Sequence, residues 1–93
     1  MNYYLLSVKH TNKRDAFITL WRANECGYTL YQEAAGLYAL GHAEAVEKYN
    51  NYSAVKVHKD LLTGLWVKDH LENGHGILNT PENWAKFGVL FEM

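Results

Sequence analysis

The sequence contains very little cysteine and proline: one residue of each, Cys26 and Pro81, among 93 residues. A single cysteine cannot form an internal disulfide, which is typical of proteins from a reducing cytosol. One proline excludes a proline-rich linker, and no change of composition marks a boundary between domains. The chain is therefore expected to form a single compact domain over residues 1–93.

Long apolar runs and an excess of charge of either sign are also missing. No stretch approaches the ~20 apolar residues of a membrane span. The first ten residues, MNYYLLSVKH, lack the basic start and the apolar core of a signal peptide. The formal net charge of −1 argues against a polycation that coats nucleic acid. These features predict a cytoplasmic protein with no membrane partner, for which nucleic acid is not the expected ligand.

Apolar residues make up 48% of the chain and aromatic residues 14%, which suits a globular domain with an aromatic-rich core. β-branched and aromatic residues predict strands over residues 3–8, 16–22 and 28–31. These three strands would form an antiparallel meander with the second strand at its centre, covered on both sides. A fourth short strand is predicted over residues 53–57, and an edge strand at residues 77–78.

Two helices are predicted in the middle of the chain. Good helix formers occupy residues 42–49, where Val46 and Tyr49 lie one turn apart. The stretch DLLTGLWV, residues 60–67, has its leucines at helical spacing, although its glycine costs roughly 1 kcal/mol relative to alanine. The following ENGHG, residues 72–76, is expected to be a flexible turn.

The clearest local signal is NTPENWAKFG near the end of the chain. Thr80 is the expected N-cap, Pro81 takes the first helical position, and Gly88 stops the helix. Trp84 and Phe87 then lie on one face, one turn apart. Taken together, the pattern predicts an α+β fold: an antiparallel sheet with two or three short helices.

Signatures of common enzymes are absent from the sequence. His70 and His75 do not form the H-E-x-x-H pattern, and Gly74 interrupts the helix that such a pair requires, so no metal site is expected. Cys26 and the serines lie in no nucleophile signature, and the glycines are too scattered for a phosphate loop. We expect no cofactor and no catalytic residue, which favours a binding protein over an enzyme.

The most polar segment is KHTNKRD, residues 9–15, between the first two predicted strands. Its cations, histidine and threonine can donate hydrogen bonds, and Asp15 could orient a cation or accept from a ribose hydroxyl. An arginine fork and an indole face at the end of the next strand suit a phosphate and a nucleobase. The candidate ligand-binding residues from this pattern are Lys9, His10, Thr11, Arg14, Asp15, Trp21 and Arg22.

Two alternatives stay open for this segment. A solvated loop is the simpler interpretation, because loops are ordinarily polar and exposed. In addition, neighbours on a strand point to opposite faces. Trp21 and Arg22 would therefore share a site only where the strand ends or bulges, or where the pocket forms between the subunits of a homo-oligomer.

The frame KHTNKRD-AFITLWRANECGYTLYQEAAGLY, with NTPENW downstream, resembles a family of small proteins encoded in phages and prophages. Ala23 stands where members often have proline, and residues 39–78 match only loosely. The resemblance adds Asn24, Tyr28 and Asn83 to the candidate ligand-binding residues. The positions that carry the pattern are Lys9, His10, Thr11, Asp15, Trp21, Arg22, Asn24, Gly27, Tyr28, Ala35, Gly36, Tyr38, Asn79, Asn83 and Trp84.

The resemblance implies a phage context, in which short proteins without catalytic signatures often act on the host by binding. We therefore predict a counter-defence protein that sequesters a nucleotide-derived immune signal. One alternative is an inhibitor that binds a host defence protein directly, as anti-CRISPR proteins do. Another is a small nucleotide-processing enzyme with His10 and Asp15 as the acid–base pair.

Overall fold

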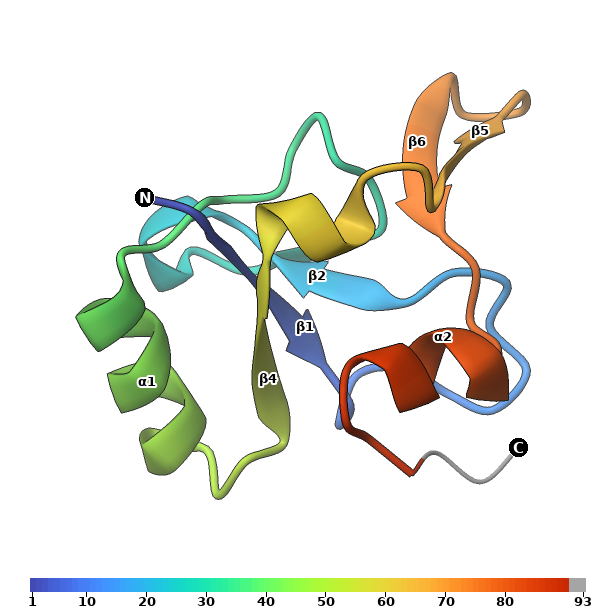
Figure 1. The fold of residues 1–93 in the computed structure, drawn as a ribbon. Helices are drawn as coiled ribbons and strands as arrows, with labels where there is room; N and C mark the ends of the chain where they lie inside the picture. The colour runs from blue at the N-terminus through green and yellow to red at the C-terminus, as the bar shows by residue number, and fades with distance from the viewer. Residues whose placement is uncertain (91–93) are drawn as a thin grey trace.

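The computed structural model describes residues 1–90 and has an α+β fold (Figure 1). The strands are β1 (Tyr3–Ser7), β2 (Thr19–Trp21), β3 (Tyr28–Thr29), β4 (Ala54–His58), β5 (Trp66–Asp69) and β6 (Gly74–Ile77). The helices are α1 (Leu40–Tyr49) and α2 (Pro81–Lys86), with 3-10 turns η1 (Ala23–Glu25) and η2 (Lys59–Leu62). Neither described helix is long and apolar enough to cross a membrane.

The main sheet has four antiparallel strands in the order β3-β2-β1-β4. The predicted meander of the first three strands is therefore confirmed, and β2 is an interior strand with all three residues buried. After β3, the chain passes through α1 and returns as β4, which pairs with the other edge of β1. The fourth predicted strand, over residues 53–57, is thereby confirmed as well.

Side chains alternate between the two faces of this sheet, as the pleat requires. On one face, Leu5 and Trp21 pack with Ala43 and Val46 of α1. On the other face, Leu6 and Leu20 belong to a second cluster. Further members of that second cluster are Tyr4, Ile18, Val57, Leu62, Ile77 and Trp84. The sheet is thus covered on both sides, which explains why β2 has no polar face.

The predicted helix over residues 60–67 is wrong. Only the 3-10 turn η2 forms there, and the chain continues as strand β5 from Trp66. Gly64 has a φ of +84°, in the left-handed region that interrupts right-handed winding and that glycine adopts without cost. Leu62 is buried whereas Leu61 is 56% exposed, so the leucines do not form one helical face.

The predicted turn over residues 72–76 is correct only at its start, because β6 begins at Gly74 and pairs with β5. Glycine is needed in this strand for close packing. A Cβ on Gly76 would lie 2.5 Å from a ring carbon of Phe17, and one on Gly74 would lie 2.6 Å from the ring of Tyr31. Two aromatic rings therefore lie directly on the β6 backbone. The glycines that suggested a turn are instead part of a strand.

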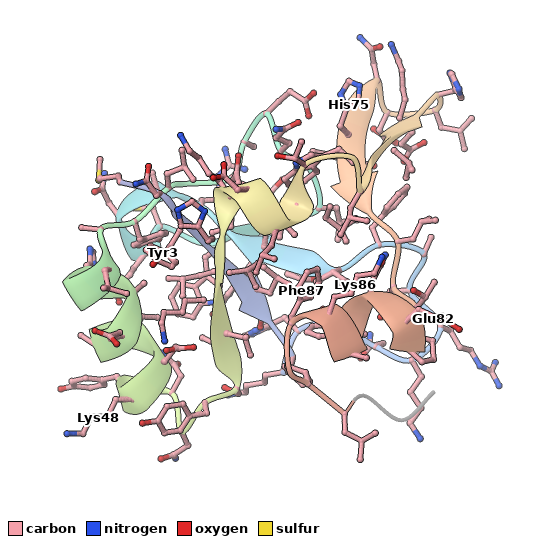
Figure 2. The ribbon with its side chains drawn as sticks, viewed as in Figure 1. Tyr3, Lys48, His75, Glu82, Lys86 and Phe87 are labelled. Atoms are coloured by element: carbon pink, nitrogen blue, oxygen red, sulfur yellow. The ribbon has the colours of Figure 1, made fainter. Side chains whose placement is uncertain are left out.

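Two side-chain pairs hold the β5–β6 hairpin to the segment after β3. The Tyr31 hydroxyl donates to Asp69 at 2.7 Å, and this bond raises the pKa of Tyr31 to about 12. The Glu33 carboxylate accepts from the backbone N–H of His75 at 2.9 Å and lies 2.6 Å from its Nδ1. Those hydrogen bonds lower the pKa of Glu33 to about 2. Figure 2 shows His75 on β6, at the end of the molecule that this hairpin forms.

The sequence predicts both helices, α1 and α2, and the structure shows how each one packs. In α2, the Thr80 side chain accepts from the N–H of Asn83, and Gly88 follows with a φ of +76°, so both predicted ends are confirmed. Trp84 is fully buried, and Phe87 packs against the same cluster (Figure 2). In α1, the predicted helix over residues 42–49 is confirmed. Val46 is buried, whereas Tyr49, one turn away, is 93% exposed.

Candidate functional site

The connection between β1 and β2 is fixed by threonine hydroxyl groups. The Thr11 hydroxyl donates to the carbonyl of Ser7 at 2.6 Å and accepts from the N–H of Thr19 at 2.9 Å. The Thr19 hydroxyl in turn donates to the carbonyl of His10 at 2.9 Å. Thr11 is 4% exposed. The first part of KHTNKRD is therefore an ordered extension of the hairpin.

The second part of the segment is held by Asn79, which precedes α2. Its amide nitrogen donates to the carbonyls of Asn12 and Asp15, both at 3.0 Å. Its carbonyl oxygen accepts from the Trp84 indole at 2.7 Å. The Asp15 carboxylate accepts from the N–H of Asn12 at 2.8 Å. Hydrogen bonds therefore hold this turn both to the segment that starts the C-terminal helix and internally, between Asn12 and Asp15.

The fixed loop places His10 over the aromatic residues of β2 and β3. The imidazole of His10 stacks on Tyr28, with ring centroids 4.0 Å apart and planes 29° apart. Tyr28 is the strand partner of Trp21 and meets its ring edge-on at 5.2 Å. Tyr28 is 41% exposed and Trp21 is 8% exposed. An exposed stack of two rings thus lies above a buried indole.

Ser7 orients the imidazole of His10. Its hydroxyl oxygen accepts from the backbone N–H of His10 at 3.1 Å and lies 2.8 Å from the ring Nδ1. Because that oxygen accepts the backbone N–H, its own proton can be donated to Nδ1, which leaves Nε2 as the ring donor. Ser7 is 2% exposed, so the pair fixes a ring position and does not present a nucleophile.

Positive charge gathers in this part of the chain. Residues 1–22 contain four cations and one acid, a net charge of +3, whereas the whole chain carries −1. The cations are Lys9, Lys13, Arg14 and Arg22. All four are exposed, and none forms an ion pair with a residue between 1 and 90. Their charges are available to a ligand without first breaking an internal salt bridge.

Arg22 follows Trp21 and lies across from Gly27, the residue that precedes Tyr28. Its backbone N–H donates to the carbonyl of Gly27 at 2.8 Å, and its carbonyl accepts from the Tyr38 hydroxyl. Its Cδ is 3.7 Å from where a Cβ on Gly27 would be. The side chain therefore runs along the residue that precedes Tyr28. The regular strand ends at Trp21, and Arg22 forms an isolated antiparallel bridge with Ala35.

Four of the ten candidate residues lie close along the chain here: His10 stacks on Tyr28, Lys9 precedes His10, and Arg22 bonds to Gly27, which precedes Tyr28. We call them the His10–Tyr28 surface. Trp21 supports this surface from beneath. Its Nε1 is buried and makes no hydrogen bond within residues 1–90, so its role is packing and its indole offers no stacking face.

The remaining candidate residues lie outside this surface, and most of them stabilise the fold. Thr11 and Asp15 hold the loop, as described above. The Asn83 amide donates to the carbonyl of Leu78 at 2.9 Å, at the start of α2. Asn24 adopts a φ of +57° in η1, a conformation that asparagine tolerates better than most residues. Arg14 is exposed in the pinned turn.

Ser7, Thr19 and Asn79 were missed as site-forming residues by the sequence patterns. A signal for Asn79 existed, because it belongs to the NTPENW stretch of the family pattern. No sequence signal linked it to a loop more than sixty residues earlier. Within residues 1–90, no group of three or more histidine, cysteine, aspartate or glutamate side chains could hold a metal ion.

Comparison with known proteins adds no further constraint on this site: no family model, no curated protein and no solved structure matches the chain.

Proposed function

We propose that the chain is a binding protein whose His10–Tyr28 surface holds a nucleotide-derived, phosphate-bearing ligand. The observation that carries the proposal is the exposed His10–Tyr28 ring stack, in a part of the chain whose cations form no ion pair within residues 1–90. A nucleobase stacks on an aromatic ring with little regard to its sequence identity. Phosphate oxygens accept from an arginine fork and attract a lysine ammonium group.

Each member of the surface has a part in this binding. The outer face of the His10 ring is the stacking face, and Tyr28 supports it from the other side. The exposed cations Arg22 and Lys9 would receive the phosphates. Because Thr11 and Ser7 already fix the loop that carries His10, the ligand need not order this part of the site, which reduces the free-energy cost of binding.

In the phage context that the family pattern implies, the biological role would be sequestration. A protein that binds a nucleotide signal tightly, without catalytic residues beside it, lowers the free concentration of that signal. We propose that this chain acts on a host immune nucleotide in that way. The exposed imidazole and the phosphate-accepting cations support the nucleotide part of the proposal, and the residue pattern supports the phage part.

A ligand screen tests the proposal directly. Thermal unfolding is followed with cyclic nucleotides, cyclic oligonucleotides and ADP-ribose derivatives. A ligand at 100 times its dissociation constant should stabilise the fold by ~2.7 kcal/mol. If no member of the panel at millimolar concentration raises the melting temperature, the proposal fails.

The role of Arg22 is then measured by titration calorimetry with the ligand that the screen finds. Arg22→Ala should weaken binding by ~1.5–3 kcal/mol, the worth of a hydrogen bond to a charged group. Arg22→Lys should restore only part of this loss, because the planar fork is gone. Lys48→Ala is the matched control, since Lys48 lies at the end of α1 and points away from the sheet (Figure 2). Equal affinity of Arg22→Ala and wild type would remove Arg22 from the site.

A second candidate, direct binding to a host defence protein, is favoured by one observation. Tyr49 and Tyr52 are 93% and 66% exposed at the end of α1, and tyrosine is enriched at protein interfaces. Recovery of one defined host protein by the wild-type chain, and its loss with Tyr49→Ser and Tyr52→Ser together, would support this candidate. Loss of the partner with Arg22→Ala instead would place the contact at the His10–Tyr28 surface.

A further inference from the structure

A cleft of about 410 Å³ opens on the opposite face of the sheet from the His10–Tyr28 surface. Its wall is built from four separate parts of the chain: β1, the segment after β3, the η2 turn with the residues that follow it, and the start of β5. In Figure 1, η2 is the yellow turn in front of the sheet. The polar and aromatic residues of the lining are Tyr4, Gln32, Lys59, Asp60, Thr63 and Trp66.

Three of the polar side chains of this cleft have no partner inside the described part of the protein. Gln32, Lys59 and Thr63 make hydrogen bonds within residues 1–90 only through backbone groups. The Asp60 carboxylate has one neighbour, Nδ1 of His58 at 3.6 Å, and is 78% exposed. An amide, an ammonium, a carboxylate and a hydroxyl thus converge on one cleft with their hydrogen-bonding capacity free.

The aromatic part of the lining has a defined shape. The rings of Tyr4 and Trp66 meet edge to face, with centroids 5.4 Å apart and planes 68° apart. Rings at this angle form a corner and cannot sandwich a flat base between them. Tyr4 is buried and Trp66 is half-buried, so Trp66 is the ring that a ligand can reach. The corner therefore offers one aromatic face and a polar rim.

We propose that this cleft is a second binding site, and that its ligand is a neutral saturated sugar ring, a pyranoside. Lys59 and Asp60 carry opposite charges at neighbouring positions, so the cleft does not select an anion or a cation. Sugar hydroxyls donate and accept at once, as the Gln32 amide and the Thr63 hydroxyl also do. The C–H face of the ring would lie on Trp66. A cleft of this size is within the range of small-molecule sites.

Saturation-transfer NMR on the full chain tests the site, with methyl glycosides of glucose, galactose, mannose and N-acetylglucosamine as probes. Adenosine and phenylalanine are the comparison ligands for a nucleobase and for a zwitterion. Each is added at about 5 mM, where a site of millimolar affinity is largely filled. We expect at least one glycoside to receive saturation on its ring C–H protons, more strongly than the two comparison ligands.

Asp60→Asn and Thr63→Val then locate the contact, because both side chains are exposed and neither makes an internal hydrogen bond. Asp60→Asn should weaken glycoside binding about tenfold to a hundredfold, the loss of one hydrogen bond to a charged group. Glu82→Gln is the matched control at the start of α2, which contributes no lining residue (Figure 2). It should bind as wild type does.

Three results would overturn the proposal. The first is that no glycoside receives saturation. The second is that Asp60→Asn and Thr63→Val bind glycosides with wild-type affinity. The third is that adenosine or phenylalanine binds in an Asp60-dependent manner while the glycosides do not. Because Arg22 is not a lining residue of the cleft, loss of nucleotide binding in Arg22→Ala would leave glycoside binding unchanged, so the two proposals fail or hold separately.

Discussion

Asn79 carries the sharpest stability prediction, because it joins the C-terminal helix to a loop near the N-terminus. Its side chain is 6% exposed and makes three hydrogen bonds, to the carbonyls of Asn12 and Asp15 and to the Trp84 indole. Asn79→Ala removes all three. With about 0.5–1.5 kcal/mol for each bond, the free energy of unfolding should fall by about 2–4 kcal/mol. That is a large share of the stability of so small a domain.

Urea unfolding followed by tryptophan fluorescence measures this loss. For a domain of this size, each kcal/mol lowers the melting temperature by about 4–8 °C. Asn2→Ala is the matched control. Within residues 1–90, Asn2 bonds only through its carbonyl, as acceptor for the N–H of Lys59, and the substitution leaves that group in place. Amide exchange of Asp15 should accelerate in the Asn79 variant and stay unchanged in the control. An Asn79→Ala protein within ~0.5 kcal/mol of wild type would refute the anchoring role.

Two further predictions concern the β5–β6 hairpin. Gly76→Ala should destabilise the protein by about 1–3 kcal/mol in chemical denaturation, because the new Cβ would lie 2.5 Å from Phe17 and crowd a packed site. Gly41→Ala meets nothing within 4 Å and should stabilise α1 by up to about 1 kcal/mol; equal effects of the two changes would contradict the packing argument. The pKa of Glu33 is lowered from 4.5 to about 2 by the hydrogen bonds from His75. Its stabilising contribution is therefore present above pH 4.5 and is lost as the pH falls towards 2. In Glu33→Gln, the melting temperature should depend less on pH over that window. A melting temperature that falls with pH as steeply as in wild type would disprove the linkage.

The elements that followed from the sequence are those whose signals are local. The α2 helix is defined by a cap, a proline and a terminal glycine within ten residues, and each acts on its immediate neighbours. The first three strands follow from runs of β-branched and aromatic residues joined in order. Where two signals conflicted, at residues 60–67, the leucine spacing predicted a helix but the backbone of Gly64 decided the outcome.

The strand β6 shows why composition alone can mislead. Gly74 and Gly76 have the composition of a turn, yet they lie in a strand because Tyr31 and Phe17 pack on their backbone. That contact joins residues more than forty positions apart. No window of sequence contains both partners, so periodicity and propensity could not detect it.

The sequence by itself determined an α+β domain, an antiparallel meander, the C-terminal helix and the concentration of polar groups in KHTNKRD. These properties depend on the periodicity of side chains, on helix capping and on charge, and each of these is set by residues close together in the sequence. It also identified His10 and Arg22 as candidates, since their chemistry is independent of the fold, and the residue pattern added Tyr28.

Only the tertiary structure decided which of those candidates meet. It buried Thr11 and Trp21, and it used the side chains of Asp15 and Asn83 in local hydrogen bonds. It stacked His10 on Tyr28, and it assembled a cleft on the far side of the sheet from four separate segments. The physical reason is that burial and long-range hydrogen bonding depend on contacts across the folded chain. A polar side chain such as Thr11 supports the fold where a residue distant in sequence hydrogen-bonds to it, as the N–H of Thr19 does.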